Sequence, residues 1–137
     1  MTPSDVIGPW AQHADLTPAR RLNIELRLIP AVNLLEQRMR EDGFVFPVNP
    51  ATLTGVSGKT FGGFRPQDCP QGAPLSNHKQ GLGVDRYDPL NRIDDWCMAH
   101  LDVVAACGIW IEHPDATPGW SHWQCVPPKS GRRVFRP

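Results

Sequence analysis

The first half of the chain carries an apolar pattern that predicts a long helix. Across residues 17–43, leucine, isoleucine and methionine side chains recur every three to five positions, which places them on one face of a helix. Thr17 is a plausible cap at its start, and Gly43 is typical of its end. Pro30 lies inside this period and should kink the helix or split it in two.

The second half combines one further helical period with short strand patterns. Residues 88–108 repeat the helical spacing, with acidic residues in the first turn and Gly108 as the stop. Residues 109–113 and 120–126 alternate in the manner of strands on either side of a turn-prone segment, and together they predict a terminal hairpin. "FVFPV" at 44–48 is interpreted as a short buried strand.

These elements indicate a single domain, residues 1–137, of the α+β class. One or two N-terminal helices should pack on a small, mainly antiparallel sheet. Residues 49–63 are interpreted as a loop or an irregular hairpin, and the many prolines and glycines from residue 47 onward favour loops and short strands there. The basic tail at 127–137 is interpreted as a solvated end rather than a binding segment.

Charge and hydropathy exclude two classes of partner. Fourteen basic residues balance fourteen acidic ones, so we expect no nucleic acid bound through a basic footprint. No apolar stretch approaches the length of a membrane span, and the start of the chain lacks an export leader, so we expect no membrane insertion and synthesis in the cytoplasm.

The cysteines are expected to be reduced, because an unexported protein normally keeps free thiols. They are Cys69, Cys97, Cys107 and Cys125. His100 shares a predicted helix with two of these cysteines, but buried thiols are a better interpretation than a second metal site, because Cys97 and Cys107 fall on one apolar stripe.

"SNHKQGLGVD" and the later "GWSHWQ" contain residues that could bind a metal. Gly81 and Gly83 let the backbone turn and approach closely, so that Asp85 can face His78 seven residues earlier. His122 would come from the last strand. Two imidazoles and a carboxylate form a ligand set of catalytic zinc, which keeps its fourth position open.

Three motifs in register resemble the D-alanyl-D-alanine carboxypeptidase family of zinc peptidases. This family includes VanX- and VanY-like enzymes and many phage endolysins, and shares its fold with hedgehog domains. The matching elements are Gly63-Phe64-Arg65-Pro66, the pattern of Ser76, His78, Gly81 and Asp85 with Gly83 in place of alanine, and Trp120-x-His122. The resemblance covers roughly residues 22–126.

The resemblance implies that His78, Asp85 and His122 ligate a zinc ion (Zn2+) in a cleft of the sheet. It further implies that Arg65 holds a substrate carboxylate or stabilises an oxyanion, a task suited to its planar fork of donors. Ser76 would bind near the metal or the substrate terminus, although a serine there can equally bond its own backbone.

Two further residues are assigned near this cleft. Many relatives carry a glutamate three residues before the last histidine as general base, and that position here is Gly119. Glu112, on the strand expected to pair with the last one, is the candidate catalytic base, and Asp115 and His113 are alternatives. Trp120 is assigned to substrate binding.

The resemblance therefore implies a metallopeptidase that hydrolyses the stem peptide of bacterial peptidoglycan. Whether it acts as a carboxypeptidase on D-Ala-D-Ala or as an endopeptidase on an L-Ala-D-amino acid bond stays open. A bacteriophage endolysin, made in the host cytoplasm and active in cell wall degradation, fits best. The alternative is a virion or tail module that contacts other virion proteins and retains the fold with little or no catalysis.

Overall fold

The computed structural model describes all 137 residues. A long helical run is its largest element. It consists of α2 (Pro18–Asn23), the π-helical turn η2 (Ile24–Leu28) and α3 (Ile29–Glu41). Thr17 caps α2 through its side chain. Pro30 disturbs the regular helix, as predicted, but does not split it in two: proline has no N–H to donate, and the preceding turn widens so that Ile29 N–H bonds to Ile24 O five residues back, while the helical run continues.

The second helical period is two helices rather than the single one predicted. They are α5 (Arg92–Ala99) and α6 (Leu101–Ala106). His100 breaks the run because its backbone is not helical and its ring Nδ1 donates to Trp96 O at 2.7 Å. Both carboxylate oxygens of Asp88 accept the first free N–H groups of α5, which explains the sharp helix start.

Four short helical segments were not foreseen. They are α1 (Pro3–Ile7), followed by the 3-10 turn η1 (Gly8–Trp10); α4 (Asn77–Gln80); and the 3-10 turn η3 (Pro114–Ala116). Each has five residues or fewer, so no helical period could reveal it from the sequence.

A mixed sheet of four strands, in the order β1-β3-β2-β4, completes the fold. The strands are β1 (Gly83–Tyr87), β2 (Trp110–Glu112), β3 (Trp120–Gln124) and β4 (Val134–Phe135). The predicted hairpin is confirmed as the antiparallel pair β2 and β3. The interpretation of the tail as a solvated end holds only in part: residues 129–132 are exposed, but the chain then returns and adds β4 parallel to β2.

The prediction of a buried strand at 44–48 is also wrong. This segment forms no strand, and the Val45 and Val48 side chains are 76% and 62% exposed. Neither valine N–H has a bonding partner within the chain, and Pro47 has no N–H to offer a ladder. The two phenylalanines of the segment make its main contacts, because their rings lie under arginine guanidinium groups.

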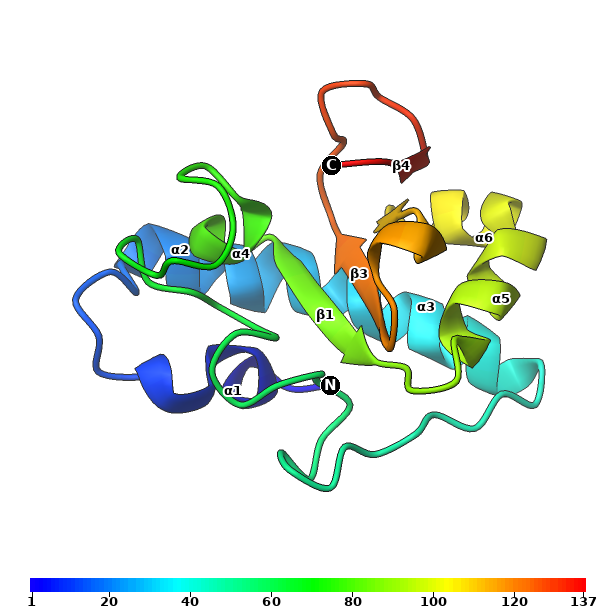
Figure 1. Ribbon diagram of the computed structural model, residues 1–137, viewed down its shortest axis with the longest axis horizontal. Helices are drawn as coiled ribbons and strands as arrows, with labels where there is room; N and C mark the ends of the chain where they lie inside the picture. The colour runs from blue at the N-terminus through cyan, green and yellow to red at the C-terminus, as the bar shows by residue number, and fades with distance from the viewer.

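The helical run and the sheet bury the core between them and fix the position of β1. Figure 1 shows the helical run passing behind β1 and β3, with α2 beyond β1 next to α4 and α3 continuing behind the sheet. Trp123 of β3 is fully buried in this core. Arg86 of β1 forms a buried ion pair with Glu36 of α3, so β1 is tied to the helix by charge as well as by packing. None of the helices has the length and apolar character needed to cross a bilayer.

Candidate metal centre

His78 is presented by the one-turn helix α4. The Ser76 hydroxyl accepts the N–H of Lys79 and so caps this turn. Gly81 ends it in the left-handed conformation, at φ 72°, where a Cβ would lie 2.7 Å from the carbonyl oxygen of Arg20. Ser76 therefore makes the backbone bond that a loop serine can make, and it also lines the hollow described below.

Asp85 and His122 face each other across the sheet. They are direct partners in the antiparallel register of β1 and β3, so their side chains project from the same face. Gly83 makes room for this arrangement, because a Cβ there would lie 3.1 Å from Cε1 of His122. The glycine-rich run thus serves the placement of the imidazole as well as the turn of the backbone.

The three side chains meet at one point. His78 Nε2 lies 3.1 Å from Asp85 Oδ1 and 3.2 Å from His122 Nδ1, and His122 Nδ1 lies 2.8 Å from Asp85 Oδ1. All three residues are at least 93% buried. Residues separated by up to 44 positions in the chain therefore bring one potential ligand atom each to a common centre.

Outer hydrogen bonds orient all three ligands. His78 Nδ1–H donates to the carbonyl oxygen of Gly63 at 2.8 Å, which leaves Nε2 as a bare acceptor at the centre. Arg65 Nη2 donates to Asp85 Oδ2 at 3.0 Å, leaving Oδ1 to face the imidazoles. The outer nitrogen of His122 bonds to Gln124. Such partners fix ring orientation and raise the affinity of a metal site.

The electrostatics of the cluster favour a positive charge at its centre. Burial would raise the pKa of Asp85, but its interactions with His78 and His122 outweigh burial and hold that pKa well below its ordinary value. Burial lowers the pKa of His78. For His122 burial acts in the same direction, but the hydrogen bond and charge of Asp85 prevail and raise its pKa. An ionised carboxylate thus faces two imidazole nitrogens.

The donor atoms fit a zinc ion. Tetrahedral zinc with bonds of about 2.0–2.2 Å to nitrogen and oxygen holds its ligand atoms about 3.3–3.6 Å apart, and the three atoms here are separated by 2.8–3.2 Å. Small outward rotations of the side chains bring them to that spacing. Two imidazoles and one carboxylate also leave the fourth position of a tetrahedral ion open.

The centre opens into a hollow of about 360 Å³. Trp120 and Phe135 contribute aromatic surface to its lining, and Glu112 contributes a carboxylate whose pKa is raised by burial. Arg65 does not line the hollow; its Nε and Nη2 are engaged by Phe61 O and Asp85.

The alternative bases lie away from the hollow. Asp115 and His113 do not line it, and the exposed Asp115 is paired with Arg136. Gly119 is at a positive φ of 89°, and a Cβ built there meets no atom within 4 Å. Of the acidic residues weighed as base from the sequence, only Glu112 shares the hollow with the three ligands.

Two functional candidates escaped the sequence interpretation. Gln124 follows His122 by two residues in a strand, so the period of two could have placed both on one face. Phe135, whose ring meets the His122 ring edge-on at 6.2 Å, had no such signal. Its position depends on the return of the tail, which Arg133 secures through its stacking on Trp110.

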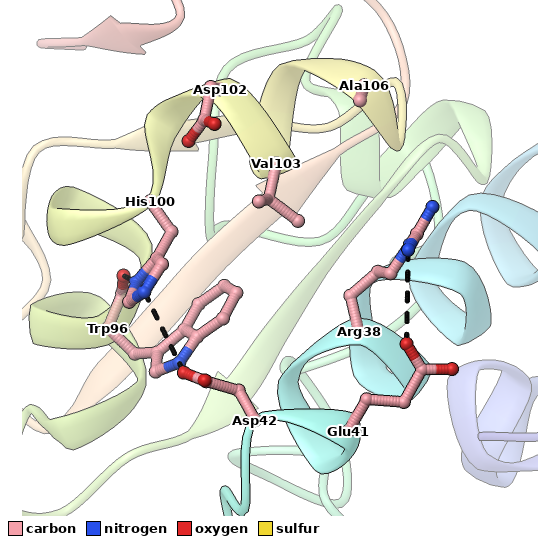
Figure 2. A pocket seen from close by; sticks show the side chains of 8 residues that line it. All are labelled: Arg38, Glu41, Asp42, Trp96, His100, Asp102, Val103 and Ala106. Carbon is pink, nitrogen blue, oxygen red and sulfur yellow. Dashed lines mark hydrogen bonds and ion pairs between the residues drawn. The ribbon is translucent and has the colours of Figure 1, made fainter.

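The cysteines and His100 do not form a second metal centre. Cys97 and Cys107 are buried, and His100 lines a separate groove between α3 and the α5–α6 pair. Figure 2 shows the His100 ring stacked on Trp96, with Asp42 below both. Trp96 Nε1 donates to Asp42 Oδ2 at 2.7 Å, so the polar atoms of this groove serve to join the helices.

A second group of potential ligands, His13, Asp15 and Asp68, lies near the surface. His13 Nδ1 accepts the backbone N–H of Asp15, and Asp15 Oδ2 accepts that of Gln67. These bonds account for the cluster as a loop connection, and the buried triad remains the candidate centre. Comparison of the chain with protein-family models, with curated proteins and with solved structures found no match in any of the three.

Proposed function

We propose that this protein is a zinc-dependent peptidase that hydrolyses peptide bonds of bacterial peptidoglycan, as its motifs suggest. One observation carries the proposal: His78, Asp85 and His122 converge within 3.2 Å at a hollow that also contains a carboxylate. Metal ligands, an open face and an acid in one hollow are the components of metal-assisted hydrolysis.

The roles of the residues follow from their positions. His78, Asp85 and His122 would hold the zinc, and zinc in such a site supplies a Lewis acid that polarises a carbonyl and acidifies water. Glu112 faces the same hollow and would accept the proton of the attacking water and pass it to the leaving amine. The raised pKa of Glu112 brings its basicity closer to that of neutral solution, as this task requires.

The aromatic surface of the hollow would position the substrate. Trp120 and Phe135 offer flat apolar faces against which a stem peptide can lie. Arg65 contributes through Asp85, which it orients, and its remaining Nη1 is the only part of its fork without a bonding partner. This geometry supports an orienting task for Arg65 more directly than contact with a substrate carboxylate.

A second function is favoured by one specific observation. Gly119 stands where related peptidases carry their glutamate, and its turn supplies no side chain at all. A phage virion module that binds wall peptide without cleaving it is therefore the alternative.

Metal analysis and a cleavage assay separate the two functions. Purified protein is analysed for zinc and then incubated with purified muropeptides, with and without a chelator, and the products are identified by mass. Chelator-sensitive appearance of shortened stem peptides supports the peptidase. Stoichiometric zinc with intact muropeptides supports the binding module, and absence of zinc from protein prepared in its presence refutes the peptidase.

A further inference from the structure

The ring of His122 is held between two groups that place its proton on opposite nitrogens. On the inner side, Asp85 Oδ1 lies 2.8 Å from Nδ1 and would accept a proton carried there. On the outer side, the Oε1 atom of Gln124 lies 3.1 Å from Nε2. A neutral imidazole has a single N–H, so only one of the two contacts can be satisfied at a time.

The orientation of the Gln124 amide is set by the backbone. Its Nε2 donates to the carbonyl oxygen of Val126 at 2.8 Å. Turning the amide over would bring two oxygens together at that contact, so Oε1 must face His122. Since Oε1 only accepts, His122 must donate from Nε2. Gln124 is 2% exposed, and water does not readily replace this contact.

We infer that Gln124 is a positioning residue for the metal: it holds the proton of His122 on Nε2 and thereby directs the bare Nδ1 towards His78 and Asp85. The inference rests on the zinc site proposed above and assigns a role to a residue outside the ligand set. His78 shows the complementary arrangement, because Gly63 O fixes its proton on Nδ1 and leaves Nε2 bare. The two histidines therefore present opposite nitrogens to the centre.

Without Gln124 the balance at His122 changes. Asp85 would then be the only acceptor in contact with the ring, and the proton would settle on Nδ1, at the position that the metal needs. Before zinc could bind at Nδ1, the proton would have to leave this nitrogen. Loss of an outer-shell partner of this kind typically weakens metal binding by about 10–100-fold.

Two substitutions test the inference through zinc affinity, measured by competition with a chromogenic chelator. Gln124→Leu removes the acceptor at similar volume, and we expect its zinc dissociation constant to rise by about 10–100-fold. Gln124→Glu keeps an acceptor for His122 Nε2–H, and in the neutral acid form that burial favours it can still donate to Val126 O as the amide does, so we expect affinity close to that of the native protein. Asn77→Ala is the matched control, because this amide lines the same hollow but bonds to none of the three ligands.

A second readout follows the proton itself. In metal-free protein labelled with 15N-histidine, at a pH where both rings are neutral, long-range proton–nitrogen spectra report which nitrogen of His122 is protonated. We expect Nε2–H in the native protein and in Gln124→Glu, and a shift towards Nδ1–H in Gln124→Leu. This spectrum needs neither zinc nor peptidase activity. Even if the Leu variant fails to fold, a proton found on Nδ1 of His122 in the native protein overturns the inference.

The outcomes distinguish this inference from the proposed function. Zinc binding by Gln124→Leu at native affinity, or a native His122 protonated on Nδ1, overturns the role of Gln124 while leaving the zinc site intact. Failure of the native protein to bind zinc refutes the proposed function. Rescue by glutamate together with the tautomer shift establishes positioning, because a residue that merely fills space would give neither.

Discussion

Asp94 of α5 provides a sharp test of how burial controls stability in this fold. Its side chain is fully buried, and its Oδ1 has no hydrogen-bond partner. The remaining oxygen accepts a long bond, 3.4 Å, from the Thr117 hydroxyl, and the hydroxyls of Ser121 and Thr117 only partly offset the effect of burial on the pKa of Asp94. Burial, and to a smaller extent the nearby charge of Asp88, raise the pKa of Asp94 from 3.8 to about 7. We therefore expect Asp94→Asn to stabilise the protein at neutral and alkaline pH.

The size of the effect follows from proton linkage. Between pH 3.8 and about 7 the folded protein keeps the Asp94 proton whereas the unfolded chain has lost it. Stability that is fully present below pH 3.8 is therefore lost as the pH rises through about 7. The difference of about three pH units corresponds to about 4 kcal/mol at most. This is a large share of the total stability of a domain, typically about 5–15 kcal/mol.

Urea unfolding at pH 4, 5.5 and 7.5 measures this effect. Asparagine matches the shape of the neutral acid and does not titrate, so the free-energy advantage of Asp94→Asn should grow from near zero at pH 4 towards about 4 kcal/mol at pH 7.5. Asp95→Asn is the control, because Asp95 is exposed in the same helical turn and should show no such growth. Native and Asp94→Asn curves that stay parallel over this range would show that Asp94 is ionised in the folded protein and that the reasoning is wrong.

Three further predictions concern the metal centre. Zinc at about 100 times its dissociation constant should stabilise the protein by about 2.7 kcal/mol, which for a chain of 137 residues raises the melting temperature by about 9 °C; calorimetry with and without chelator checks this, and an unchanged melting temperature contradicts a zinc site. His122→Ala should abolish both the zinc-dependent shift and any muropeptide cleavage, and a retained shift would remove His122 from the ligand set. Glu112→Gln should keep the shift while lowering the cleavage rate by about 10²–10⁴-fold, and full activity of this variant would exclude Glu112 as the base.

The sequence predicted that His78 and Asp85 face each other because the determinants of that contact are local. Gly81 and Gly83 are needed for a tight backbone path, and they mark the turn that carries His78 towards Asp85. The alternating strand pattern around His122 then indicated which face of the sheet carries its side chain. Residues whose positions follow from short-range geometry can be read from the chain.

The failures concern long-range partners. "FVFPV" has the composition of a strand, but no other segment pairs with it, and composition says nothing about the availability of a neighbour. The break at His100 depends on a side chain that bonds to the backbone of its own helix, which apolar spacing does not register. The return of the tail as β4 is held by backbone bonds to β2 and by stacking of Arg133 on Trp110, which are contacts between distant positions.

The choice between peptidase and binding module depends on Glu112 more than on the metal. The three donor atoms of the candidate metal centre and their outer partners are in place whichever function holds. Catalysis additionally needs a group that can move a proton within the same hollow. Gly119 cannot supply it, and Asp115 is turned outward towards Arg136. Glu112 comes from β2, the strand that pairs with the one bearing His122, so the hairpin that contributes His122 to the candidate metal centre also introduces the acid. Loss of cleavage with retention of zinc in Glu112→Gln, together with loss of zinc in His122→Ala, would therefore show that the hairpin supplies both the acid and a metal ligand.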